Sequence, residues 1–172
     1  MSVSTYSLSI PVFLRGLNIL SALLEKGRAH ATEKAIPLDS LFNARLAPDM
    51  LPLSGQIQRV SDTSKNAVGR TTAIAAPSFP DNEQTYEELE ERVRKTIAFL
   101  ETVKPEDMAE SGERDVTIKV GKLEHTFAGN DYLLTFAIPN FFFHLTTAYD
   151  ILRNQGVPVG KMDYLGPYKA GA

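Results

Sequence analysis

One histidine and one carboxamide lie four residues apart in the stretch NFFFHLTTAY, residues 140–149, which is otherwise rich in apolar side chains. At helical spacing, Asn140 and His144 share one face of a helix. Histidines at this spacing can bind a single metal ion, because their side chains converge one turn apart. A polar side chain on an apolar helix face costs desolvation free energy unless it has a partner. Asn140 and His144 are therefore the first candidates for a functional site.

The residues alone leave two interpretations of His144 open. As a functional residue it would be a metal ligand or a proton carrier; as a core residue it would share a hydrogen bond with a facing side chain or carbonyl group. Asp49 and Gln56 lie near the start of a second expected helix, and either could meet His144 across a bundle. His30, at the polar end of the first helix, is interpreted as structural. His125 is expected to be partly buried in a hairpin.

Several classes of active site are excluded by motif. The chain has no cysteine, so it has no disulfide, thiolate metal site or cysteine nucleophile. A glycine-rich phosphate loop, a nucleophile elbow, an HExxH helix and an EF-hand loop are also missing from the sequence. Carboxylate-bridged di-iron sites require Glu three residues before the histidine, and residue 141 is Phe.

Composition places the chain among ordinary globular proteins. Its 172 residues suit a single domain, residues 1–172, with a core of its own. The net charge of -3 argues against a general nucleic-acid-binding protein, which needs a basic face. No apolar run is interpreted as a membrane span of about 20 residues. The amino terminus lacks the basic start and apolar block of a signal peptide, so a cytoplasmic location is expected.

Hydrophobic periodicity predicts a mainly α protein, an antiparallel four-helix bundle with a small β-hairpin inserted before the last helix. The bounds follow from the apolar spacing and from proline and glycine, which interrupt helices. The expected elements are a helix at 7–34, a short turn at 38–46 capped by Asp39 or Ser40, a helix from 48–52 to 74, a helix opened by Thr85, a hairpin at about 114–128, helical segments at 131–137 and 139–154, and an ordered carboxy-terminal strap without further elements at 157–172.

The third long helix begins with a capping-box pattern, Thr85 followed by Glu88. Three acidic–basic pairs four residues apart follow, and each can stabilise a solvated helix face by about 0.2–0.5 kcal/mol. These pairs are Glu88–Arg92, Glu90–Arg94 and Glu91–Lys95. The charged run therefore indicates a solvent-exposed surface.

Residues after Arg114 alternate between apolar and polar types, which is typical of a strand. Gly121-Lys122 predicts a two-residue turn, and the resulting register pairs Val120 with Leu123, Ile118 with His125, and Val116 with Phe127. The face that holds these six residues is largely apolar, so we expect it to pack on the helices.

A helical projection of the last helix assigns an inner arc to Phe141, Leu145, Ala148, Tyr149 and Leu152. Phe143 points the other way. Its exposure indicates a subunit contact, with packing beneath the tail or the hairpin as the alternative.

Four stretches together resemble the DinB/YfiT-like superfamily, whose members are grouped as metalloenzymes, and within it a family of unknown function. They are NARLAPDMLP at 43–52, FAGNDYLL at 127–134, PNFFFHLTTAY at 139–149 and GVPVGKMDYL at 156–165. The resemblance implies a metal held by one histidine of the second helix and a His-x-x-x-His pair of the last. His144 matches the second of that pair. Position 140 is Asn, and Gln56 or Asp49 lies nearest the expected helix-2 ligand.

Two of the three implied imidazoles are thus replaced, which weakens the case for zinc or nickel and for the thiol-dependent transferase activity that the superfamily suggests. We therefore expect a non-catalytic or small-ligand-binding homodimer with a degenerate metal site. Its ligand pocket would be lined by His144, Asn140, Asp49, Gln56 and Tyr149. The alternative is a metal-dependent enzyme with an altered ligand set, in which His144 binds a divalent metal, zinc or nickel, together with Asp49 or Gln56 and water.

Overall fold

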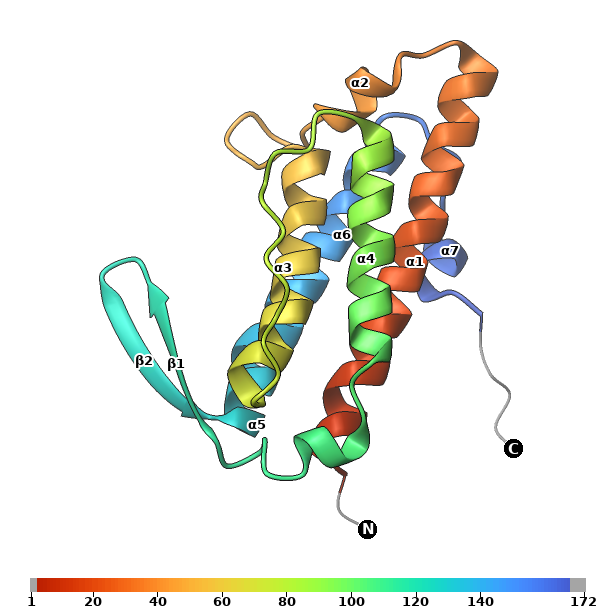
Figure 1. Ribbon diagram of the computed structural model, residues 1–172. Helices are drawn as coiled ribbons and strands as arrows, with labels where there is room; N and C mark the ends of the chain where they lie inside the picture. Colours follow the sequence, from red (N-terminus) through yellow and green to blue (C-terminus); the bar gives the residue numbers. More distant parts are fainter. Residues whose placement is uncertain (1–2, 168–172) are drawn as a thin grey trace.

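The computed structural model describes residues 3–167, and these contain four long helices, α1 (Thr5–Lys34), α3 (Leu53–Thr71), α4 (Tyr86–Glu101) and α6 (Ile138–Asn154). Each long helix packs against two others, so that α1, α6, α3 and α4 follow one another around a shared core. The predicted mainly α bundle with a hairpin before the last helix is confirmed (Figure 1).

The helices are not connected in a simple up-and-down order. The segment between α3 and α4 runs back along α3, so α3 and α4 point in the same direction (Figure 1). α1 and α6 both run the opposite way. As a result α6 packs antiparallel to α3, which is the pairing that places Asn140 and His144 beside the second long helix.

The buried face of α3 contains a stripe of apolar and small side chains. Most residues in the second half of this stripe have small side chains, and the larger residues of the stripe are fully buried. The stripe consists of Leu53, Ile57, Val60, Ser64, Ala67, Val68 and Thr71. Small side chains allow the backbones of neighbouring helices to approach closely, and here they bring α3 against both α4 and α6.

The helix ends follow the expected local chemistry in most places. The Thr85 hydroxyl accepts a hydrogen bond from the Glu88 amide, and the Glu88 carboxylate accepts one from the Thr85 amide, which confirms the capping box. Gly156 takes a φ of +86° after α6, and the Val157 amide donates to the Leu152 carbonyl oxygen, as in a glycine-terminated helix.

The connection between α1 and α3 differs from the prediction. A short helix, α2, spans Leu38–Phe42, and its N-cap residue is Pro37 instead of Asp39 or Ser40. α3 begins after Pro52 and ends at Thr71, so it is shorter than expected at both ends. Its end has a local cause, because the Thr72 hydroxyl accepts the Ile74 amide and holds the chain out of the helix.

Before α6 the chain forms α5 (Gly129–Tyr132) and a π-helical turn, η2 (Leu133–Ala137). The residues that join these segments keep right-handed helical angles, so the helix is continuous from 129 to 154 instead of divided by Pro139. Proline lacks an amide hydrogen and clashes with the carbonyl four residues earlier. A widened turn accommodates both effects, which explains its position just before Pro139.

The hairpin consists of β1 (Asp115–Val120) and β2 (Leu123–Ala128) in the predicted register, with Ile118 opposite His125 and Val116 opposite Phe127. The expected packing holds for β1 and, on β2, for Phe127, which is partly buried against the core. Val116 and Ile118 are buried, whereas Leu123 and His125 are exposed. The prediction of a partly buried His125 is therefore wrong, because β2 lies beyond the edge of the bundle (Figure 1).

The carboxy-terminal segment contains a short helix, α7 (Lys161–Leu165), which the sequence prediction missed. The predicted strap is ordered up to residue 167, and residues 168–172 lie outside the described part. Tyr164 of α7 packs edge-on against Tyr149, with ring centroids 5.6 Å apart, and its hydroxyl hydrogen-bonds to Thr146. The segment therefore holds α6 against α1, where Lys26 and Asp163 form an ion pair.

Helix α1 is long and apolar enough, by length and composition, to meet the criterion for a membrane span, contrary to the prediction that no such run exists. Half of its most apolar window is buried inside the bundle, as in the core helix of a globular domain. We therefore assign its apolar residues to core packing.

Candidate functional site

His144 lies half-buried on α6 and faces α3. Its ring nitrogen Nδ1 is 2.7 Å from Oε1 of Gln56, a side chain that is almost fully buried. The amide nitrogen of Gln56 donates to the carbonyl oxygen of Leu51 at 3.0 Å. Because a carbonyl oxygen can only accept, this bond fixes the orientation of the Gln56 amide and presents its oxygen to the ring. His144 must then donate from Nδ1, so its Nε2 carries the lone pair.

The environment favours the neutral imidazole. Burial, and secondarily the positive charge of Arg59, lower the pKa of His144 to about 4. A carboxylate partner would oppose this change by stabilising the imidazolium, but the partner is a carboxamide. At neutral pH the ring is therefore a hydrogen-bond donor at Nδ1 and an acceptor at Nε2.

Asn140 lies one helical turn before His144 and makes a second contact across the same helix pair. Its amide nitrogen donates to the Thr63 hydroxyl at 2.8 Å. The two bonds, His144 to Gln56 and Asn140 to Thr63, lie side by side along the α3–α6 seam. The His144 ring thus points inward, as its place on the helix predicts, and Asn140 also faces α3.

The structure brings together only part of the predicted pocket. Asp49 is exposed in the connection before α3, and Tyr149 packs beneath α7 instead of beside His144. Gln56, Asn140 and His144 share the α3–α6 seam. Thr63 and Arg59 also belong to it, and the sequence pattern did not identify either. Their position seven and three residues after Gln56, on the same helix, was the signal that could have located them.

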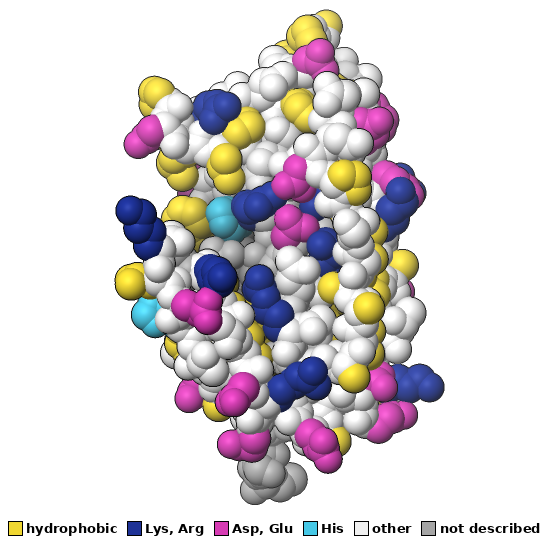
Figure 2. Space-filling model, turned by 60° about the vertical axis from the view of Figure 1, so that its left-hand side comes forward, with side chains coloured by type: hydrophobic (Ala, Val, Ile, Leu, Met, Phe, Trp, Pro, Cys, Tyr) yellow, Lys and Arg dark blue, Asp and Glu magenta, His cyan; other side chains and the backbone are white. Residues whose placement is uncertain are grey.

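A network of charged side chains adjoins this seam. Arg92 is 3% exposed and donates to Asp62 at 2.8 Å and to Glu83 at 2.7 Å. Lys65 contacts Asp62 at 3.1 Å, and Arg59 pairs with both Asp62 and Asp81. The interpretation of Arg92 as part of a solvated face is therefore wrong. On the face shown in Figure 2, basic side chains gather around a shallow depression in the middle of the molecule.

This network also holds the segment between α3 and α4 in place. Phe79, on that segment, packs between two cations, with Lys65 Nζ 5.5 Å and Arg92 Cζ 5.8 Å from the ring centroid. Two carbonyl oxygens of the same segment, those of Phe79 and Pro80, accept from Arg92. Since Arg59 bonds to Asp81 of this segment, the network also fixes the guanidinium nearest His144.

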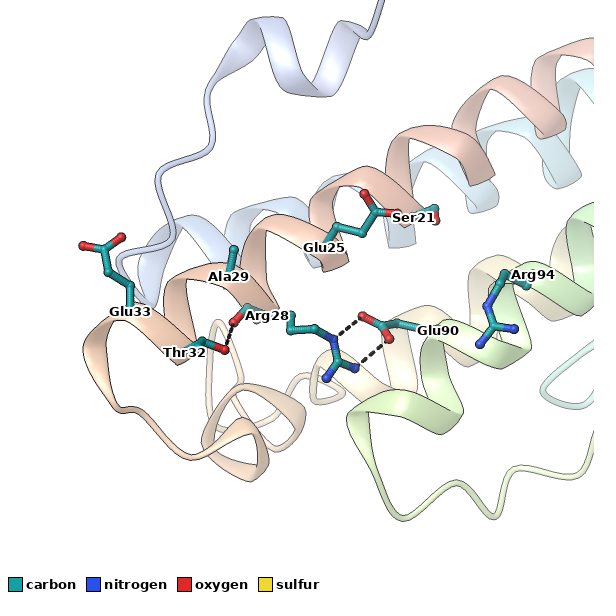
Figure 3. Close-up of a pocket in the computed structure, with 8 residues that line it drawn as sticks. All are labelled: Ser21, Glu25, Arg28, Ala29, Thr32, Glu33, Glu90 and Arg94. Atoms are coloured by element: carbon teal, nitrogen blue, oxygen red, sulfur yellow. Dashed lines mark hydrogen bonds and ion pairs between the residues drawn. The ribbon is translucent and has the colours of Figure 1, made fainter.

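A hollow of about 610 Å³ lies elsewhere, between α1 and α4. Arg28 of α1 donates two hydrogen bonds, 3.0 and 2.6 Å long, to the carboxylate of Glu90 on α4, while the Glu33 side chain points away from this ion pair (Figure 3). Hydrogen bonds to Glu90 and Glu87 raise the pKa of Arg28. Arg28 and Glu90 pair across the two helices, so we interpret this hollow as a surface groove bridged by a structural ion pair.

Comparison with known proteins agrees with this architecture. A family model described as a domain of unknown function, DUF1993, matches residues 5–165. The chain belongs to the DUF1993 family. A crystal structure of a DinB family member protein from Shewanella denitrificans is 39% identical, covers 96% of this chain and 95% of its own, and superposes with a TM-score of 0.86. No curated protein matches the chain. The DinB-like resemblance and the uncharacterised family within it are both confirmed.

The donor set of this DUF1993 protein does not fit the zinc or nickel site that the DinB-like resemblance implies. Both polar atoms of the Gln56 side chain are used, one by Leu51 and one by His144. The Asn140 amide nitrogen is used by Thr63. Within residues 3–167, no group of three His, Cys, Asp or Glu side chains converges to hold an ion. One imidazole nitrogen remains, whereas a tetrahedral catalytic site takes three protein ligands.

Replacing Gln56 with glutamate is expected to raise the pKa of His144 above its wild-type value of about 4. The substitution keeps the acceptor oxygen beside Nδ1 and adds a negative charge that stabilises the imidazolium. An NMR titration of the ring proton signals measures the change. The ring signals of His125, which is exposed on the hairpin, give the internal reference for spectral changes unrelated to residue 56. An unchanged pKa of His144 would show that the ring does not contact residue 56.

Proposed function

We propose that this protein is a non-catalytic, small-ligand-binding bundle that acts as a homodimer, and that the α3–α6 seam is its degenerate metal site. The observation that carries the proposal is the hydrogen bond of the His144 ring to Gln56 at the position where the superfamily resemblance implies a helix-2 histidine. Two of the three implied ligands are replaced by carboxamides that bond to protein groups. The seam keeps one open nitrogen, which suits recognition of a ligand better than coordination of an ion.

The protonation state of His144 supports a binding role over acid–base catalysis. A general base works best when its pKa lies near the working pH, and the pKa of His144 is lowered to about 4. Catalytic histidines are commonly oriented by a carboxylate, which stabilises the imidazolium as it forms. Gln56 orients the ring without supplying that charge.

Metal analysis of protein purified without a histidine tag tests the proposal. We expect zinc and nickel well below one ion per chain, both in the wild type and in His144→Ala. Stoichiometric metal in the wild type that is lost in His144→Ala would contradict it and would support a metal-dependent enzyme with an altered ligand set. His125→Ala is the matched control, because that histidine is exposed on the hairpin.

The homodimer is proposed on exposed apolar side chains of the last helical region. Phe143 is 56% exposed and Leu134 is 51% exposed, on a segment that packs Leu133, Ala137 and Phe141 into the bundle. Burial of such side chains favours association. Sedimentation equilibrium should give a dimer for the wild type and a shift toward monomer for Phe143→Ser. A wild-type monomer at all concentrations would exclude this part of the proposal.

A cytoplasmic location completes the proposal. It is supported by the cysteine-free sequence and by the burial of the apolar face of α1 in the bundle. Fractionation of cells that express the untagged chain should recover it in the cytoplasmic fraction. Recovery with membranes or with exported proteins would exclude this location.

A further inference from the structure

A second hollow, of about 580 Å³, lies at the carboxy-terminal end of α3, beside the 3-10 helix η1 (Pro105–Met108) and the turns that follow it. Residues 71–73 contribute part of its wall, and residues within 106–114 contribute the rest. None of them belongs to the α3–α6 seam around His144. The function proposed above therefore leaves this hollow unexplained.

Carboxylates dominate the wall of this hollow. Four exposed acidic side chains line it, and Arg114 is the only basic residue of the described wall. The four are Glu106, Asp107, Glu110 and Glu113. Within residues 3–167 no salt bridge joins any of them to a basic side chain. The end of α3 adds to the effect, because the carbonyl groups of a last helical turn carry partial negative charge. The hollow thus favours a cationic ligand.

A buried hydroxyl on the same wall is a second sign of a ligand, independent of the charges. Ser111 lines the hollow and is 2% exposed, and its Oγ has no hydrogen-bond partner in the described chain. The Ser111 amide donates to the Met108 carbonyl oxygen, and a methyl group added at Gly129 would lie 1.8 Å from the Ser111 carbonyl oxygen. The backbone of Ser111 is therefore fixed by its neighbours. Its hydroxyl oxygen can accept a hydrogen bond from a ligand, and burial makes an unmade bond costly.

The arrangement of the carboxylates selects among cations. A calcium ion takes about six to eight oxygen ligands that converge on one point. In the part of the chain that the structure describes, no three acidic or histidine side chains converge in this way. A linear polyamine carries its ammonium groups along a chain, so each group can pair with a separate carboxylate. The volume of the hollow suits a small molecule of this kind.

We propose that this hollow binds linear polyamines, with one ammonium group donating to Oγ of Ser111 and the others paired with the surrounding carboxylates. The site is independent of the α3–α6 seam, so its failure would leave the proposed function standing.

Putrescine and its analogue with both nitrogens trimethylated make a matched pair of probes. Both carry two positive charges on the same chain, but the methylated form has no N–H to donate. NMR titrations at low ionic strength, which follow the backbone amide signals of residues 106–114, should show putrescine binding about threefold to tenfold more tightly, as expected for one hydrogen bond. Equal binding of the two probes, or no binding of either, would overturn the inference. Calcium chloride that binds more tightly than putrescine would indicate a metal site and would overturn it as well.

Ser111→Ala provides the second arm, because it removes the acceptor without removing a hydrogen bond of the free protein. In this variant the preference for putrescine over the methylated form should vanish, and circular dichroism should show an unchanged fold. A preference that persists would place the donor contact elsewhere and overturn the assignment.

Glu110→Gln tests the charges of the wall. It should weaken the binding of both probes by about twofold to fivefold, the usual range for one exposed ion pair. Glu25→Gln is the matched control, because Glu25 is also exposed but lies on α1 at the other hollow. Its substitution should leave both affinities unchanged. Equal losses in the two variants would show diffuse attraction to an acidic surface and would overturn the proposed site.

Discussion

Replacing Arg92 with methionine should lower the free energy of unfolding by about 3–5 kcal/mol, the range found when one partner of a buried ion pair is removed. Methionine keeps much of the length and apolar contact of the arginine stem. It removes the guanidinium that bonds to Asp62 and Glu83 and to two carbonyl oxygens of the segment between α3 and α4. The Glu83 carboxylate would then remain largely buried without its cation.

Urea unfolding monitored by circular dichroism measures this loss. Arg94→Met is the matched control, because Arg94 lies two residues away on the same helix and its side chain is 64% exposed. Its substitution should change the free energy of unfolding by no more than about 0.5 kcal/mol. Equal effects of the two substitutions would mean that the Arg92 network does not stabilise the fold.

The pH dependence of the free energy of unfolding gives a second test of the Arg92 network. Burial raises the pKa of Glu83, but hydrogen bonds from Arg92 and Gln58 outweigh it, so the pKa is lowered overall from 4.5. A lowered pKa in the folded state means that the unfolded state binds the proton first as the pH falls. Ionised Glu83 therefore contributes its full stabilisation above about pH 4.5, and this stabilisation is lost progressively as the pH falls from there through the lowered pKa of the folded state. Arg92→Met should weaken this acid dependence.

Local sequence rules predicted the elements that rest on local forces. The capping box at Thr85, the register set by the Gly121-Lys122 turn and the inward face of α6 all depend on residues close in sequence. The parallel orientation of α3 and α4 was not predictable in the same manner. It depends on the segment between α3 and α4 lying along α3, which is held there by Arg92 and Lys65.

The candidate site shows the same limit. The pattern around His144 predicted an inward ring, and the helical position of Gln56 made it a possible partner. Neither pattern revealed that Arg92 turns inward, because the spacing of Glu88 and Arg92 equally suits a solvated pair. Its actual partners, Asp62 and Glu83, lie on other segments. Tertiary pairing of charges is thus what sequence spacing failed to predict here.

Phe141→Ala is expected to destabilise the protein by about 3–5 kcal/mol, the usual cost of removing a fully buried phenylalanine side chain. Phe141 has no exposed surface and packs edge-on against Phe13, with ring centroids 5.0 Å apart. Phe143→Ala, two positions along the same helix, removes an equal ring that is 56% exposed. Its effect on the unfolding of the monomer should be much smaller, and comparable losses would contradict the assigned core face of α6.

A second substitution identifies what the Phe141 ring packs against. A methyl group added at Gly16 would lie 2.4 Å from Cε1 of Phe141, so the ring occupies the space that glycine leaves on α1. Gly16→Ala should therefore destabilise the wild type, and it should destabilise Phe141→Ala much less, because the added methyl group enters the vacated cavity. The coupling measured by such a double-mutant cycle should exceed about 0.5 kcal/mol. Since Phe141 sits between Asn140 and His144 on α6, the same contact with α1 fixes the rotation of the helix that turns both polar side chains toward α3.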